Sequence, residues 1–134
     1  MSIFTRDQSV TFGDCDPAGI VYYPNYYRWM DGTFHEYLRA VSSGHSGVCA
    51  QLGARGLGLM ESKLAFRSPA VDGTVLRYAI EGITWANKSF DITYTAHDGD
   101  RLVLEGMERR GIFIEKDGRL RAGETAPLRA LLGL

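Results

Sequence analysis

Residues 14–26 read Asp14-Cys15-Asp16-Pro17-Ala18-Gly19-Ile20-Val21-Tyr22-Tyr23-Pro24-Asn25-Tyr26. This segment contains two carboxylates, a turn and a helix start, and it directly follows a run typical of a strand. A helix start presents unpaired backbone N–H groups and the positive end of the helix dipole. A carbonyl group held there would be polarised within reach of an acidic side chain. We therefore expect the chemistry of this protein at this segment.

On the C-terminal side of this segment the sequence predicts one long amphipathic helix. Its apolar residues recur at spacings of three and four, namely Tyr27, Met30, Phe34, Tyr37, Leu38 and Val41. Pro24 suits the first helical turn, where its missing N–H would have been unpaired anyway. Ser42-Ser43-Gly44 is expected to end the helix, and a short helical piece is predicted over 47–52.

The remaining segments predict strands. The first is expected over 3–12, and the second half alternates with a period of two over 60–66, 76–80, 90–96 and 101–115. Turn residues separate these runs, which favours antiparallel neighbours. Gly106 and Gly111 are expected to permit bulges or bends. The order predicts an α+β fold in which a meander of four strands follows the helix and curves around it.

Composition limits the architecture and the class of function. With 134 residues, 45% of them hydrophobic, the chain can bury one substantial core, so a single domain over 1–134 is predicted. The net charge is −1 and the 15 basic residues are scattered, which argues against a nucleic-acid binder. No apolar run approaches the roughly 18 residues that span a bilayer, and the N-terminus lacks a signal-like apolar region. We expect a cytoplasmic protein with no membrane partner and two free cysteines.

Oligomerisation follows from the predicted sheet. A small open sheet has edges, and long edge strands promote aggregation unless they are paired. A dimer that extends the sheet would pair them. The chain is therefore expected to form a homo-oligomer.

Several side chains in this sequence are candidates for chemistry. Asp14 and Asp16 could bind a metal, act as an acid/base pair, or hydrogen-bond the local backbone as turn residues. A calcium loop fits poorly, because Asn25 stands where such a loop needs a bidentate Glu. Cys15 lies between two carboxylates that disfavour its thiolate. His45 and Cys49 are spaced as a helical pair but lack a third ligand apart from a possible His35, so no metal is expected.

Phe12-Gly13-Asp14-Cys15-Asp16-Pro17-Ala18-Gly19-Ile20-Val21-Tyr22-Tyr23-Pro24-Asn25-Tyr26 closely resembles the active-site segment of the 4-hydroxybenzoyl-CoA thioesterase family. Weaker similarity extends through nearly the whole chain, including Trp85, the segment Asn87-Lys88-Ser89-Phe90 and the strand that ends near Arg110. The resemblance implies the hotdog fold, in which a curved antiparallel sheet of about five strands wraps a long central helix.

The same resemblance implies hydrolysis of an acyl-CoA to free CoA and a carboxylic acid, with 4-hydroxybenzoyl or a related aromatic acyl group favoured. Asp16 would act as nucleophile or general base, and the Tyr23 backbone N–H would polarise the thioester carbonyl. Lys88 and Arg110, with Arg109 as a neighbour, would contact the CoA phosphates. Family members form dimers that pair into tetramers with shared active sites, and no cofactor is implied.

Two departures leave alternatives open. Ala86 and Asn87 are neutral where the family's hydroxybenzoyl enzyme has arginines, so the CoA nucleotide would be held differently. The strand Leu59-Met60-Glu61-Ser62 resembles the broader acyl-CoA thioesterase group more than the hydroxybenzoyl enzyme, which leaves the acyl group open. The acyl group could instead be carried by acyl carrier protein. The chain could also be a non-catalytic module that binds acyl-CoA or pairs with another protein through its sheet edge.

Overall fold

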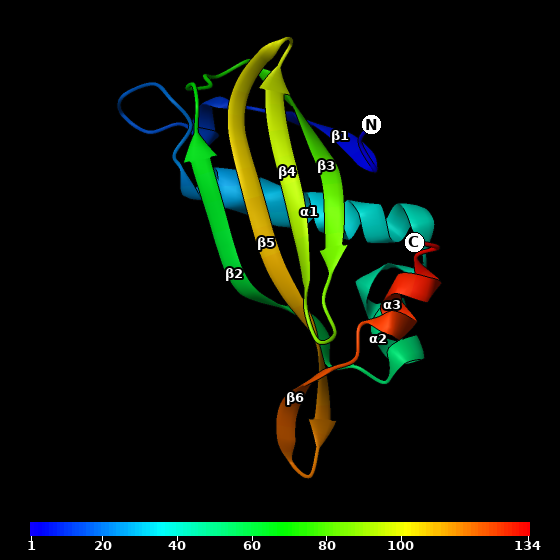
Figure 1. Ribbon diagram of the computed structural model, residues 1–134. Coiled ribbons are helices and arrows are strands. Elements are labelled where there is room, and N and C mark those ends of the chain that lie inside the picture. The colour runs from blue at the N-terminus through cyan, green and yellow to red at the C-terminus, as the bar shows by residue number, and fades with distance from the viewer.

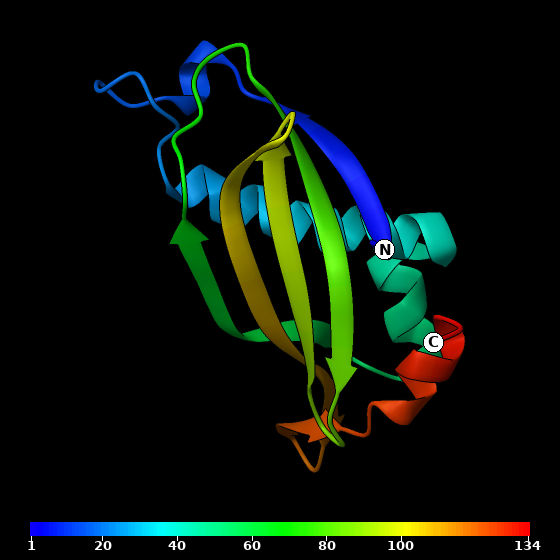
Figure 2. The same ribbon diagram turned by 45° about the horizontal axis from the view of Figure 1, so that its top comes forward.

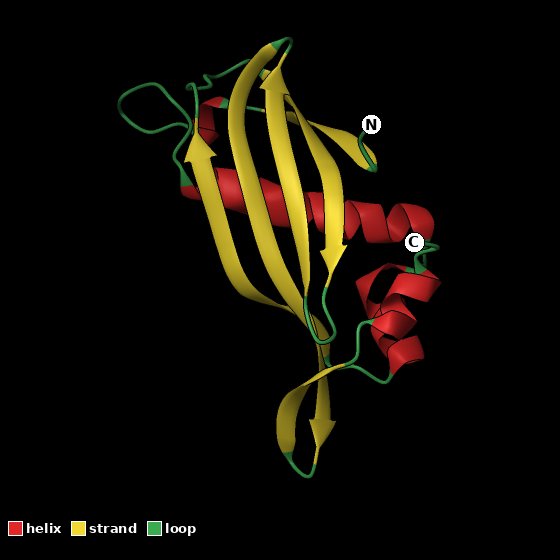
Figure 3. Ribbon diagram, viewed as in Figure 1, coloured by secondary structure: helices red, strands yellow, loops and turns green.

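A computed structural model describes all residues, 1–134. In chain order its elements are β1 (Phe4–Ser9), the 3-10 turn η1 (Phe12–Asp14), α1 (Pro24–Val41), α2 (Gly44–Leu52), β2 (Gly56–Phe66), β3 (Val75–Trp85), β4 (Phe90–Asp98), β5 (Arg101–Lys116), β6 (Arg119–Gly123) and α3 (Ala126–Leu131) (Figures 1 and 3). The predicted long helix is confirmed from Pro24 to Val41, and the short helical piece begins earlier, at Gly44. The first strand ends at Ser9, before the 3-10 turn.

The sheet has the order β1-β3-β4-β5-β2, with β6 paired to the far end of β5, and every pair is antiparallel. The predicted meander of four strands is therefore wrong at its first link, because β2 pairs with β5 and not with β3. The connection over 67–74 is longer than a hairpin turn and crosses to the other side of the sheet, where β1 and β4 occupy both edges of β3 (Figure 1). The β6 strand was not predicted.

The core lies between α1 and the concave face of the curved sheet (Figure 2). Residues of α1 that face the sheet are almost fully buried, namely Tyr26, Trp29, Met30, Phe34, Tyr37 and Leu38. A buried hydrogen bond links the two layers, because the Tyr78 hydroxyl of β3 donates to the Tyr26 carbonyl at 3.1 Å. Of the residues predicted for the apolar face, Met30, Phe34, Tyr37 and Leu38 are buried as expected. Tyr27 is half-buried and Val41, in the last turn, is exposed.

Gly106 and Gly111 have a different role from the expected bulges. The irregularities in register lie elsewhere, at Leu59/Glu61, Ile80/Gly82 and Ala96/His97. A Cβ added at Gly106 would lie 2.6 Å from the Met30 sulfur. The missing side chain of Gly106 leaves room for the Met30 side chain of α1 to pack against the middle of β5.

The two edges of the sheet and the ends of the chain complete the architecture. β1 is one edge, and β2 is the other, where Leu59 and Met60 are exposed. The helices α2 and α3 lie together beyond the C-terminal half of α1, and the β5–β6 hairpin extends away from the body (Figure 1). None of the helices is both long enough and apolar enough to span a membrane.

Candidate active site

The loop that carries Asp16 projects from the start of α1 and is closed at its base (Figures 1 and 2). The Asp16 N–H donates to the Ile20 carbonyl and the Tyr22 N–H donates to the Asp14 carbonyl, both at 2.9 Å, and these two bonds flank an isolated bridge between Cys15 and Val21. At the loop tip Gly19 has φ 81°, a conformation that other residues rarely adopt. Backbone hydrogen bonds within the segment therefore fix where Asp16 lies.

The Asp16 carboxylate has one committed oxygen and one free oxygen. Oδ1 accepts the Ala18 N–H at 2.9 Å, which is the turn geometry expected of an aspartate before proline. The other oxygen has no hydrogen-bond donor, and no cation forms an ion pair with the group. Asp16 is half-buried. A carboxylate oxygen that is ordered and unpaired is able to attack a carbonyl or to take a proton from water.

Asp14 has a structural role at the other end of the same turn. Its Oδ2 accepts both the N–H and the hydroxyl of Thr11 at 2.9 Å, which closes a capping box around η1. The Cys15 thiol faces the Thr11 carbonyl at 3.7 Å. Asp14 and Cys15 therefore support the turn, and Asp16 is the carboxylate that keeps a free oxygen.

Tyr23 stands immediately before the first residue of α1. The neighbouring backbone N–H groups are already used or absent. The Tyr22 N–H donates to the Asp14 carbonyl, Pro24 has no N–H, and the Asn25 N–H donates to the Tyr22 carbonyl at 3.0 Å. The Tyr23 N–H donates to no acceptor in this structure. It is an unpaired donor at the positive end of the α1 dipole, which suits it to bind a carbonyl oxygen that gains negative charge.

A cavity of about 370 Å³ lies beside this loop, lined by Ile20, Val21, Tyr23, Tyr26, Phe66, Arg67, Ser68 and Pro69. Its walls come from the loop, from α1 and from the connection after β2. The rings of Tyr26 and Phe66 lie 5.7 Å apart, and burial raises the pKa of the Tyr26 hydroxyl, which therefore stays neutral. The cavity is suited to an apolar or aromatic group.

Lys88 lies at a second cavity, far along the sheet from the loop. This cavity, of about 710 Å³, is lined by Lys88, Ile114, Lys116, Asp117, Arg121, Ala122, Gly123 and Glu124. None of its three cations, Lys88, Lys116 and Arg121, forms an ion pair. Lys116 and Arg121 were not among the predicted site residues, because the short strand β6 that brings Arg121 to this cavity was not predicted.

Arg109 is held by carboxylates on the outer face of the sheet. Its Nε and Nη2 contact the two oxygens of Asp91 at 2.8 and 3.0 Å, and Glu61 lies 3.9 Å from Nη1. The hydrogen bond from Arg109 lowers the pKa of Asp91. Arg109 is exposed, but its guanidinium is already engaged by these carboxylates.

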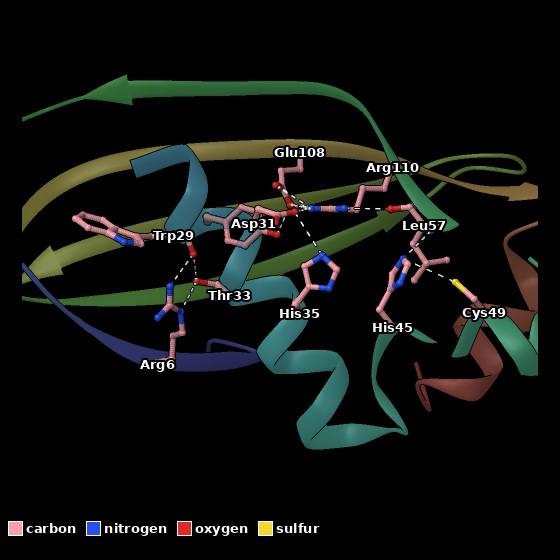
Figure 4. A network of polar contacts seen from close by, with 11 residues as sticks. Arg6, Trp29, Asp31, Thr33, His35, His45, Cys49, Leu57, Glu108 and Arg110 are labelled. Carbon is pink, nitrogen blue, oxygen red and sulfur yellow. Dashed lines mark hydrogen bonds and ion pairs between the residues drawn. The ribbon is translucent and has the colours of Figure 1, made fainter. Parts of the chain in front are cut away.

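The structure corrects the expectation for Arg110. Its side chain is 3% exposed and points into the core, where Nη2 contacts Asp31 Oδ1 at 2.6 Å and Glu108 Oε2 at 3.0 Å (Figure 4). Nη1 donates to the Leu57 carbonyl at 3.1 Å, and the guanidinium lies over the Phe34 ring. Arg110 is unavailable to a CoA phosphate because it is buried and its donors are used.

The carboxylates around Arg110 differ in environment. Glu108 is 1% exposed, burial raises its pKa, and it accepts the Tyr94 hydroxyl at 2.6 Å. Asp31 is half-exposed, and contacts with His35 and then Arg110 lower its pKa to about 2. This buried network joins α1 to β5 and is separate from the loop of Asp16.

His45 and Cys49 form the neighbouring part of the same region (Figure 4). His45 Nε2 accepts the Leu57 N–H at 3.1 Å and lies 3.7 Å from the Cys49 sulfur. Burial lowers the pKa of His45 and raises that of Cys49, so the neutral forms of both groups are favoured. A neutral buried thiol is a poor nucleophile.

A family model described as the Thioesterase-like superfamily matches residues 10–130. The chain belongs to this superfamily. The 4-hydroxybenzoyl-CoA thioesterase of Pseudomonas sp. (strain CBS-3) is 35% identical in an alignment 128 residues long that covers 90% of this chain and 90% of that one. A 1,4-dihydroxy-2-naphthoyl-CoA hydrolase of Synechococcus sp. (strain CC9311) is 26% identical and covers 90% of this chain and 83% of its own.

Solved structures of the superfamily agree with this assignment. A crystal structure of a mutant 4-hydroxybenzoyl CoA thioesterase complexed with 4-hydroxybenzoyl CoA matches with a TM-score of 0.84 at 31% identity, covering 96% of this chain and 97% of that one. A gentisyl-coenzyme A thioesterase matches with a TM-score of 0.77 at 26% identity, covering 94% and 99%. The predicted hotdog fold and the predicted thioester hydrolase class are confirmed.

Proposed function

We propose that this protein hydrolyses an aromatic acyl-CoA to CoA and a carboxylic acid at the loop of residues 14–23. The proposal rests on two groups of this closed loop that have no hydrogen-bond partner. They are the free oxygen of the Asp16 carboxylate and the unpaired N–H of Tyr23 at the start of α1. Together they supply an attacking or basic group and an electrophilic group for one carbonyl.

In the reaction, the thioester carbonyl oxygen accepts the Tyr23 N–H, which stabilises the negative charge that develops there. The Asp16 carboxylate either attacks the carbonyl carbon or removes a proton from an attacking water. In the first case the C–S bond breaks, CoA leaves as a thiolate, and water then cleaves the mixed anhydride and restores Asp16. In the second case water is added directly and the same two products form.

An aromatic acyl group is supported by the lining of the cavity beside the loop. Tyr26 and Phe66 form one wall, and the cavity volume of about 370 Å³ exceeds that of a single benzoyl ring. The relatives at 26–35% identity are named for hydroxybenzoyl and dihydroxynaphthoyl thioesters. We assign the acyl group to this class.

The phosphates of CoA require cations that are exposed and unpaired. Lys88, Lys116 and Arg121 meet both conditions around one cavity. In this proposal these three cations contact the CoA phosphates in place of Arg110. They also supply the positive charge that the neutral Ala86 and Asn87 lack. Arg109 remains a weaker candidate, because a phosphate would compete with Asp91 for it.

We also propose that two copies pair through β2. This edge strand exposes Leu59 and Met60 and has no partner on its outer side within one chain. Pairing would satisfy the edge and cover both side chains. Light scattering at micromolar concentration tests this proposal, and a monomer would contradict it.

The main experiment measures release of thiol from a panel of benzoyl-, hydroxybenzoyl- and fatty acyl-CoA thioesters. We expect hydrolysis with a preference for the aromatic substrates, and Asp16→Asn should lower kcat by about 10³-fold or more with its circular dichroism spectrum unchanged. Asp100→Asn, in the exposed turn between β4 and β5, is the matched control and should keep wild-type kcat.

Other outcomes of the panel favour the alternatives. Faster turnover of the same acyl group on acyl carrier protein than on CoA would assign a different carrier. CoA binding without hydrolysis of any thioester would indicate a binding module. Near-normal kcat for Asp16→Asn would remove Asp16 from the mechanism.

A further inference from the structure

We infer that Asn25 is a positioning residue that holds the Asp16 loop against the start of α1. The inference rests on the proposed function of that loop. Asn25 is the second residue of α1 and is half-buried. Its side-chain Nδ2 donates to the Asp14 carbonyl at 2.9 Å, across a sequence separation of 11 residues.

The acceptor of this bond is the residue at which the two legs of the loop meet. The Asp14 carbonyl also accepts the Tyr22 N–H at 2.9 Å, so both lone pairs of the carbonyl oxygen are used. Asp14 itself is fixed from the N-terminal side by Thr11. Asp14 is therefore held by hydrogen bonds to three residues, Thr11, Tyr22 and Asn25, which come from different parts of the segment.

Among the three residues that contact Asp14, only Asn25 belongs to α1. The Tyr22 N–H and Thr11 bonds are local to the loop and to η1. Without the Asn25 side-chain amide, the leg that carries Asp16 would be connected to α1 only indirectly, through Tyr22, whose carbonyl accepts the Asn25 backbone N–H at 3.0 Å. Tyr23, whose N–H stands at the start of α1, could then shift relative to Asp16.

Such a shift matters because the two proposed groups act on the same carbonyl. Asp16 lies two residues after the Asn25 acceptor, and Tyr23 lies two residues before Asn25. A misplacement of about 1 Å between reacting groups can lower a rate by about 10²-fold. The hydrogen bond is expected to influence the chemical step and not the binding of the CoA nucleotide, whose proposed cations lie around the other cavity.

The experiment compares Asn25→Asp, which has the same shape but lacks the N–H donor when ionised, with Asn25→Ala. The matched control is Gln51→Glu, the same change of amide to carboxylate on the exposed face of α2. Steady-state kinetics are measured for each variant on the best acyl-CoA of the panel, well below its melting temperature. We expect both Asn25 variants to lose about 10- to 100-fold in kcat with KM within about two-fold of wild type, and Gln51→Glu to match wild type.

Two results would overturn the inference while the proposed function stands. One is wild-type kcat in both Asn25 variants, and the other is a raised KM with kcat unchanged. A purely structural role would lower the melting temperature without changing kcat of the folded protein, which is also contrary to the inference.

If the wild-type protein hydrolyses no thioester, the proposed function fails. Amide hydrogen exchange then tests whether Asn25 holds the loop against α1. Faster exchange of the Tyr22 N–H in Asn25→Ala than in wild type would support it. Equal exchange would overturn it.

Discussion

Arg110 and Glu108 lie two residues apart on β5 and form an ion pair inside the core, with Arg110 Nη2 3.0 Å from Glu108 Oε2. Residues at this spacing on a strand face the same side of the sheet, so both side chains enter the space between the sheet and α1. Each is almost fully buried. The pair is sustained by further donors and acceptors from Asp31, Tyr94 and Leu57.

Removing one partner of this pair should be strongly destabilising. Arg110→Met leaves Glu108 buried without its main counter-charge, and we expect the free energy of unfolding to fall by about 3–5 kcal/mol. Urea unfolding followed by circular dichroism measures the change. The double variant Arg110→Met with Glu108→Leu should recover much of the loss. Arg109→Met, on the outer face, is the control and should change stability far less, so equal losses at 109 and 110 would contradict the buried pair.

Stability should depend on the protonation of His45. Burial lowers the pKa of His45 below its ordinary value of 6.5, so in the range just below 6.5 the unfolded chain binds a proton that the folded chain does not. The free energy of unfolding should therefore fall as the pH falls through this range. His45→Gln keeps an acceptor for the Leu57 N–H but does not titrate, so its stability should change less between pH 7 and about 5. Parallel pH profiles for the two proteins would show that His45 does not contribute.

Gly106 is closely packed, so we predict that a larger side chain at this position destabilises the protein. A Cβ at this position would lie 2.6 Å from the Met30 sulfur and 2.7 Å from Leu64, so Gly106→Ala should cost about 1–3 kcal/mol of stability. Gly82→Ala is the control, because its Cβ would lie 3.6 Å from the nearest atom, Thr93 Oγ1. Thermal melts of both variants test the difference. An equal effect at the two sites would mean that α1 can move away from β5 at little cost.

The cations of the second cavity should act on the nucleotide end of the substrate. We expect Lys88→Ala and Arg121→Ala each to raise KM for acyl-CoA by about 3- to 10-fold, the loss of one charge-assisted contact. KM for the same acyl group on N-acetylcysteamine, which lacks the phosphates, should not change. Arg77→Ala, an exposed and unpaired arginine on β3, is the control. A rise in KM for both substrates would indicate that these cations do not act through the CoA phosphates.

Local features of the chain were predictable from the sequence. The spacing of apolar residues defines the face of α1 that packs on the sheet, and Pro24 marks its first turn. Asp14 and Gly19 make turn contacts with residues close to them in the sequence. The position of the candidate loop could be predicted because the groups that shape it are its own neighbours.

Residues that act through distant contacts were not predictable in the same way. Arg109 and Arg110 are adjacent and chemically identical, and only the direction in which the strand faces the core separates a surface arginine from a buried one. Lys116 and Arg121 lie at the same cavity as Lys88 because the β5–β6 hairpin folds there. β6 has only five residues, so its alternation of polar and apolar side chains is too short to predict a strand.

Periodicity and contacts between near neighbours were enough to predict the long helix, the turn that places Asp16 before it, and the α+β class. They were not enough to predict that β2 lies beside β5, that Arg110 is a core residue, or that Asn25 joins α1 to the loop. Strand order, burial and long-range hydrogen bonds depend on which segments meet in space, and the local pattern of residues does not specify those meetings.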